Sequence, residues 1–132
     1  MSVHDIPPCF KGQAGEALFT AECLMRGLGV SMASEGMPYD VVVDTGSVLH
    51  RVQVKSVMAA PRDAGAYHLN TKTGRPGNWR PYTKDETDWV AVWLGREEDW
   101  WNLPVELVST LTMKINPKHK KWEPYRDNWE FN

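Results

Sequence analysis

The stretch YDVVVDTGSVLHRVQVKSV, residues 39–57, decides the fold of this chain of 132 residues. β-Branched residues dominate it, and Thr45-Gly46 near its middle has turn chemistry. We therefore expect two strands, residues 39–44 and 48–57, joined as a β-hairpin. If the loop has an even number of residues and pairs Asp44 with Ser47, Asp40 lies opposite Arg51.

The hairpin has two different faces, because successive side chains of a strand point to opposite sides. One face is apolar and is expected to pack against a helix. It consists of Val41, Val43, Val48, Val52 and Val54. The other face is polar at positions in the middle of the sheet. It consists of Asp40, Asp44, Arg51, Gln53 and Lys55.

The polar face has the chemistry of a hard-cation site. A carboxylate beside an amide oxygen, here Asp40 and Gln53, suits Mg²⁺ or Mn²⁺. Lys55 on the same face could orient a water or stabilise negative charge that develops on phosphorus. Metal-assisted phosphodiester hydrolysis is therefore one interpretation. An exposed sheet face with ordinary charged residues is the other, and the pattern alone does not separate the two.

The rest of the chain predicts one mixed domain. Residues 11–28 form an amphipathic pattern, with Gly27 and Gly29 at its end. Its apolar stripe is Ala14, Ala17, Leu18, Ala21, Leu24, Met25 and Leu28. Further strands are expected over residues 30–33, 66–71, 88–94 and 99–103, and a second helix over residues 105–111. Residues 72–84 predict an irregular loop, because they contain two prolines and two glycines. The fold class is α/β or α+β, with an N-terminal helix on a mixed central sheet and a C-terminal helix.

Charge is unevenly distributed, although the net charge is only −2. Residues 50–84 carry a net charge of +6 and residues 85–106 carry −6. A third stretch, residues 114–126, has five basic residues and one acid. This segregation is typical of a basic face on a nearly neutral protein, which would suit DNA. Solvated basic loops are the alternative.

Several classes of function have no support in the sequence. No apolar run approaches the roughly 20 residues of a membrane span, and the glycine motifs of nucleotide-binding loops are missing. Cys9 and Cys23 lie outside any CxxC pattern, which argues against a disulfide framework or a zinc site. The first residues lack the features of a secretory signal, so we expect a cytoplasmic protein.

Three motifs together resemble the PD-(D/E)XK nuclease superfamily, which has a restriction-endonuclease-like core. They are Glu16 in the first helix, Tyr39-Asp40 at a strand start and the stretch VQVKS, residues 52–56. The opening KGQAGE and the later RGLGV are similar to archaeal-type Holliday-junction resolvases. The QxK form of the motif, Gln53-Val54-Lys55, is similar to that of Mrr-type restriction nucleases and of a family of small endonucleases. The same small family is also resembled by a later segment, DWVAVWLGREEDWWNLPVELV. The resemblance implies a nuclease-like domain over residues 1–112, with residues 113–132 as an aromatic, basic extension packed on it.

The resemblance also implies roles for individual residues. Asp40 would be the principal metal ligand and Lys55 the catalytic lysine, with Glu16 as the acid on the helix. Gln53 would occupy the second-acid position, and the carbonyl of Val54 would be a further ligand. Because glutamine is neutral, metal affinity should be lower and Glu16 more important. The residues expected to contact DNA are Lys11, Ser34, Arg51, Lys72, Arg75, Trp79, Arg80 and Lys84.

The function implied is a Mg²⁺- or Mn²⁺-dependent DNA endonuclease. The favoured form is a Holliday-junction resolvase in DNA recombination. The alternatives are a restriction, nicking or homing-type enzyme on duplex DNA, or a non-catalytic DNA-binding module. A four-way junction needs two symmetric nicks, so we expect a homodimer. The aromatic residues proposed for its interface are Trp100, Trp101, Trp122 and Trp129.

Overall fold

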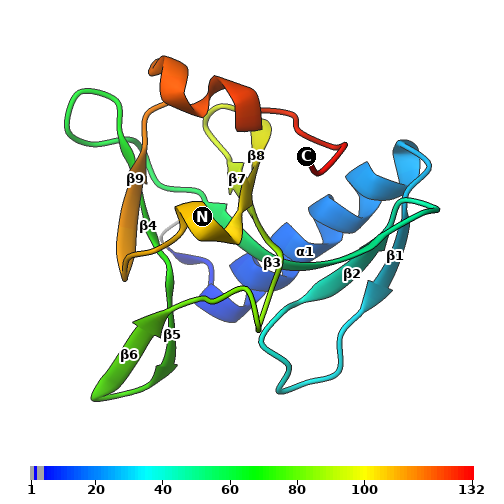
Figure 1. The fold of residues 1–132 in the computed structure, drawn as a ribbon. Coiled ribbons are helices and arrows are strands. Elements are labelled where there is room, and N and C mark those ends of the chain that lie inside the picture. The colour runs from blue at the N-terminus through cyan, green and yellow to red at the C-terminus, as the bar shows by residue number, and fades with distance from the viewer. Residues whose placement is uncertain (1, 3–4) are drawn as a thin grey trace.

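The computed structural model describes Ser2 and residues 5–132. One long helix, α1 (Pro8–Met25), packs on a central sheet of five strands (Figure 1). Those strands are β1 (Gly29–Met32), β2 (Val41–Asp44), β3 (Leu49–Val57), β7 (Trp89–Leu94) and β8 (Asp99–Pro104). The smaller elements are β4 (Tyr67–Asn70), β5 (Lys72–Arg75), β6 (Asn78–Pro81), β9 (Thr112–Ile115) and the 3₁₀ helices η2 (Val105–Leu107) and η3 (Lys120–Tyr125). The expected α+β class is confirmed.

The central sheet is mixed. Its order is β1-β2-β3-β7-β8, and only β3 and β7 pair in parallel. Two further sheets have two strands each, β4 with β9 and β5 with β6. A parallel pair needs a long crossover, and here the segment between β3 and β7 supplies it.

The β2–β3 hairpin forms, but its register differs from the expected one. Asp44 pairs with Leu49 rather than Ser47, and Val42 rather than Asp40 pairs with Arg51. The cause is a wider turn, in which the N–H of Thr45 donates to the carbonyl of Val48 (3.1 Å). A shift of two residues leaves every side chain on its expected face.

Two hydrophobic cores cover the two faces of the sheet. The core under α1 includes Phe19 and Cys23 together with four of the five expected valines, Val41, Val43, Val52 and Val54. Val48 lies in the turn and is half exposed, so its predicted burial is wrong. The opposite core is built from the other sides of β7 and β8, with β4, β9 and η3.

The buried side of α1 is not the stripe predicted from its sequence. Gly15, Phe19 and Cys23 are the buried residues, whereas Leu24 and Met25 are 60% and 77% exposed. Gly15 explains the difference, because a Cβ at this position would lie 3.1 Å from Cβ of Ser56. The absence of a side chain lets α1 approach β3 closely. The helix ends before Gly27, which adopts a positive φ of 78°.

The C-terminal part differs most from expectation. Instead of a helix over residues 105–111, the chain forms the short η2 and then β9, because β9 pairs with β4. The last residues return over β8 towards α1 (Figure 1).

The four tryptophans expected at a dimer interface are instead buried in the two cores, with exposed fractions of 7% or less for Trp100, Trp101, Trp122 and Trp129. That interface prediction is wrong.

Residues 72–84 are not an irregular loop. Strands β5 and β6 form a hairpin that projects away from the body of the molecule (Figure 1). No helix in the described part of the chain has the length and apolar character needed to cross a membrane.

Candidate active site

Asp40 lies immediately before β2 and is held on both sides by its backbone. Its N–H donates to the carbonyl of Val52 (3.0 Å), and its carbonyl accepts from the N–H of Ala33 (2.9 Å). The side-chain Oδ2 accepts from the backbone N–H of Val54 (2.8 Å). The carboxylate is therefore fixed beside the backbone of β3, in the middle of the VQVKS stretch.

Gln53 and Lys55 alternate with the buried valines of β3 and lie on the sheet face opposite α1. Both side chains are half-buried. The ammonium group of Lys55 lies 5.3 Å from the ring centroid of Tyr82, a cation–π contact that limits its movement. Burial raises the pKa of the Asp40 carboxyl group, and the charge of Lys55 offsets part of that rise.

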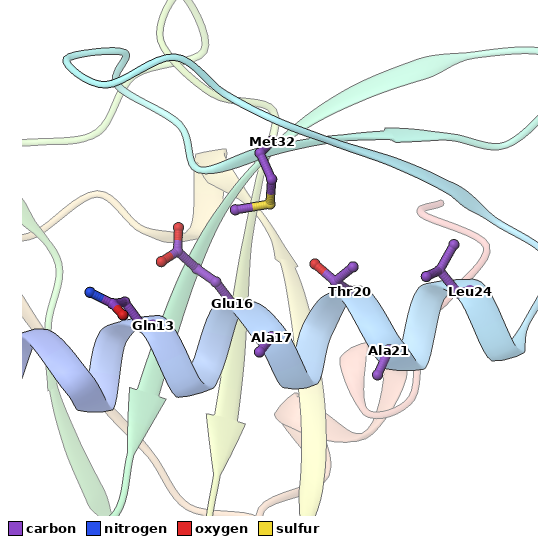
Figure 2. A pocket seen from close by; sticks show the side chains of 7 residues that line it. All are labelled: Gln13, Glu16, Ala17, Thr20, Ala21, Leu24 and Met32. Carbon is purple, nitrogen blue, oxygen red and sulfur yellow. The ribbon is translucent and has the colours of Figure 1, made fainter.

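Glu16 lies on α1, near enough to Asp40 for the two carboxylate charges to interact. Figure 2 shows its carboxylate on the side of α1 that carries Thr20 and Leu24, with Met32 of β1 above. These side chains line a groove of about 500 Å³, and Glu16 is its one acidic residue among those described. Burial raises the pKa of Glu16, and the negative charge of Asp40 raises it further. The two carboxylates therefore repel each other unless a cation or a proton lies between them.

The electrostatics of Asp40 reflect opposing effects. Burial raises its pKa, while the Val54 N–H and the charge of Lys55 act in the other direction. The balance is a raised pKa, so keeping this carboxylate ionised costs free energy in the folded protein. Such a shift is typical of carboxylates whose charge is needed for function rather than for stability.

The available donors suit a hard divalent cation. Asp40 and Glu16 offer carboxylate oxygens, Gln53 offers an amide oxygen and Val54 offers a carbonyl. Within residue 2 and residues 5–132, no three His, Cys, Asp or Glu side chains form a cluster that could hold a metal. Glutamine at position 53 is neutral, so it adds an oxygen donor without adding a negative charge.

A cationic cavity of about 310 Å³ adjoins Lys55. Lys11 of α1, Lys55 of β3 and His68 of β4 all line it, and none of its lining residues is acidic. The hydroxyl of Ser56 donates to the carbonyl of Lys11 (3.1 Å), which fixes the start of α1 against β3. A cavity with this lining suits a phosphate group.

The other residues expected to contact DNA are spread over three places. Lys72, Arg75, Trp79 and Arg80 belong to the β5–β6 hairpin. Ser34 is exposed in the connection between β1 and β2. Arg51 and Lys84 lie together beside the start of β7, away from the hairpin tip.

Arg51 has a structural contact at nearly all of its donors. It binds Asp88 through Nε (3.1 Å) and Nη2 (3.1 Å), and it donates to the carbonyls of Lys84 and Asp85 (both 2.7 Å). Burial alone would raise the pKa of Asp88, but the hydrogen bonds from Arg51 outweigh it and lower the pKa to about 2. Arg51 therefore ties β3 to the segment that leads into β7.

Comparison with known proteins identifies the family. A model of the PD-(D/E)XK endonuclease family matches residues 9–132. The chain belongs to this family. The match includes residues 113–132, which the sequence motifs left outside the resemblance. Membership of this family identifies the protein as a nuclease. PD-(D/E)XK nucleases generally use divalent metals.

Two solved structures share the PD-(D/E)XK fold with this chain. The bacterial homing endonuclease I-Ssp6803I is 20% identical with a TM-score of 0.80, covering 95% of this chain and 92% of that one. The Holliday junction resolvase Hjc of Archaeoglobus fulgidus is 19% identical with a TM-score of 0.54, covering 88% and 89%. At these identities the likeness shows the fold alone. A search of curated proteins gave no match.

Two neighbours of Lys55 in this PD-(D/E)XK endonuclease are not predicted by its sequence motifs. Tyr82 contacts the ammonium group and His68 lines the cationic cavity, held by Asp63 at 2.8 Å. Tyr82 lies in no motif or periodic pattern, and His68 lies in an expected strand that no motif links to Lys55. Only the folding of the long crossover between β3 and β7 brings them to the site.

Proposed function

We propose that this protein hydrolyses phosphodiester bonds in DNA, with Mg²⁺ or Mn²⁺ as its cation. One observation supports this most strongly: Asp40 is fixed against Val54 by a 2.8 Å hydrogen bond and also feels the charges of Glu16 and Lys55. Asp40, Glu16, Gln53 and the Val54 carbonyl would hold the cation. When bound, the cation supplies Lewis acidity and a more acidic water.

The protein's own groups have separate tasks in this proposal. The N–H of Val54 orients the Asp40 carboxylate, so that its other oxygen is free for the cation. Lys55, positioned against Tyr82, stabilises the negative charge that builds up on the scissile phosphate. Lys11 extends the cationic lining beyond Lys55 to the neighbouring phosphate, and the His68 ring lines the same cavity.

Two forms of DNA are candidate substrates. Duplex DNA is the first, because the β5–β6 hairpin projects beside the site, and because the homing endonuclease I-Ssp6803I matches almost the whole chain. A Holliday junction is the second, supported by the KGQAGE motif and by the likeness to the archaeal resolvase. A double-strand break in duplex DNA and the resolution of a four-way junction each require cuts in two strands, so we also propose a homodimer. Its interface must lie outside the four buried tryptophans.

The experiment is a cleavage assay on linear duplex, four-way junction, flap and single-stranded DNA with Mg²⁺ or Mn²⁺. We expect EDTA to stop cleavage, and Asp40→Asn or Lys55→Ala to lower the rate by on the order of 10²- to 10³-fold. Asp44→Asn is the matched control, since this exposed carboxylate on the same hairpin only accepts the N–H of Gly46. Cleavage that persists in EDTA, or an Asp40→Asn protein as active as the control, would contradict the proposal.

A further inference from the structure

The β5–β6 hairpin (residues 72–81) contributes to neither hydrophobic core. It forms a two-stranded sheet of its own and projects from the body (Figure 1). Every residue from Gly74 to Arg80 is exposed. Because so little apolar area is buried there, the hairpin adds little to folding stability. Its side chains are available to contact a partner.

The hairpin carries three positive charges, Lys72, Arg75 and Arg80, and no acid. Arg80 is held by Glu86 (2.7 Å), which fixes the base of β6. Among the residues that the structure describes, none forms a hydrogen bond or ion pair with the side chain of Arg75 or Asn78. The two polar groups at the tip therefore remain free to bind a partner.

Strand register places four polar side chains of the hairpin on one face. Arg75 pairs with Asn78, and Thr73 pairs with Arg80. Paired residues and alternate residues of a strand share a side, so all four point the same way. The opposite face carries Trp79, whose ring lies 4.6 Å from the ammonium group of Lys72.

The residues at both ends of the hairpin lie beside the catalytic lysine, Lys55. Asn70, just before β5, lines the cavity that also contains Lys55. Tyr82, just after β6, contacts the Lys55 ammonium group. Thr71 anchors this base, because its hydroxyl donates to the carbonyl of Thr110 (2.7 Å). The hairpin thus projects from the edge of the site where a phosphate would be cut.

We propose that the β5–β6 hairpin enters the major groove of duplex DNA beside the cleaved phosphate, where Arg75 and Asn78 contact base edges. The major groove admits a two-stranded ribbon. A strand of four residues spans roughly 13 Å, more than the groove depth of about 8.5 Å. Arginine pairs with guanine and asparagine with adenine through two hydrogen bonds each.

This inference rests on the proposed function, because it takes DNA as the substrate, but binding tests it independently of cleavage. The Asp40→Asn protein would be used to select from a library of randomised duplexes. We expect the selected duplexes to show a base preference at the position that the hairpin contacts. The Arg75→Ala/Asn78→Ala variant should lose this preference at one or two adjacent base pairs. Arg75→Lys, which keeps the charge but not the planar fork, should lower discrimination there by about tenfold.

Arg96→Ala is the matched control, because it removes one positive charge from the β7–β8 turn. It should leave the base preference unchanged. A dimethyl sulfate footprint should show protection of guanine N7 in the major groove, lost in Arg75→Ala/Asn78→Ala. An unchanged preference in the double variant, an equal loss of affinity for all sequences, or protection confined to the minor groove would each overturn the inference. If the wild type cuts no DNA, the proposed function fails separately, whatever the selection shows.

Discussion

The ionised carboxylate of Asp40 lowers the stability of the folded protein at the position where the proposed reaction needs its charge. Its carboxylate is half-buried, and burial raises its pKa above that of an exposed aspartate. The folded protein therefore binds a proton at Asp40 more readily than the unfolded chain does. The ionised group destabilises the fold above its raised pKa, and this cost disappears as the pH falls through that pKa.

We expect Asp40→Asn to raise the free energy of unfolding at neutral pH by about 0.5–2 kcal/mol. Asparagine can still accept the N–H of Val54, and it removes the repulsion with Glu16. The gain should shrink as the pH is lowered, because the wild-type carboxyl group then becomes neutral. Thermal melts between about pH 4 and about pH 8 would measure it, with Asp44→Asn as the control. A variant less stable than wild type at neutral pH would contradict this account.

At the scale of elements, the distance between α1 and β3 determines where Glu16 lies. Gly15 sits at the contact, and a side chain there would meet Ser56 at 3.1 Å and Val54 at 3.8 Å. Gly12, one turn earlier on α1, has open space around its Cβ position. The two glycines of the KGQAGE motif therefore have different structural roles.

Gly15→Val should destabilise the protein by about 1–3 kcal/mol, because it overpacks the helix–strand contact. Gly12→Val, the same substitution in open space, should stay within about 0.5 kcal/mol of wild type. Gly15→Val should also slow cleavage in the surviving folded protein, since α1 carries Glu16 away from Asp40. Urea unfolding and single-turnover cleavage would test both effects. Equal behaviour of the two variants would show that close approach at Gly15 is unimportant.

At the scale of the whole molecule, the C-terminal segment joins elements that are distant in sequence. The ring of Trp129 lies 5.6 Å from that of Phe19 in α1 and 6.1 Å from that of Trp100 in β8. Asn102 donates to the carbonyl of Asn128 (3.0 Å) in the same region. The last residues thus hold α1 and β8 together.

Trp129→Ala should lower the free energy of unfolding by about 3–5 kcal/mol, because it leaves a large cavity between α1 and the sheet. Trp79→Ala provides the comparison, since this tryptophan is 41% exposed on the hairpin and should cost little stability. Denaturant unfolding of both variants would measure the difference. A loss below about 1 kcal/mol for Trp129→Ala would mean that the segment only covers a core that is stable without it.

The sequence by itself determined the β2–β3 hairpin and its two faces. Strand alternation has a period of two, so Asp40, Gln53 and Lys55 were separated correctly from the buried valines even though the register was displaced by two residues. The strand β7 was also predicted, because a nearly continuous apolar run suits a buried strand, and β8 was predicted as its hairpin partner.

Only the tertiary structure decided the remaining features, because they depend on contacts between distant segments. The apolar stripe of α1 predicted the wrong face, since close packing at Gly15 outweighs the helix's own pattern. Residues 112–115 became a strand because β4 offers a partner. The placement of Tyr82 and His68 around Lys55 likewise follows from the crossover between β3 and β7, whose glycines and prolines carry no periodic signal.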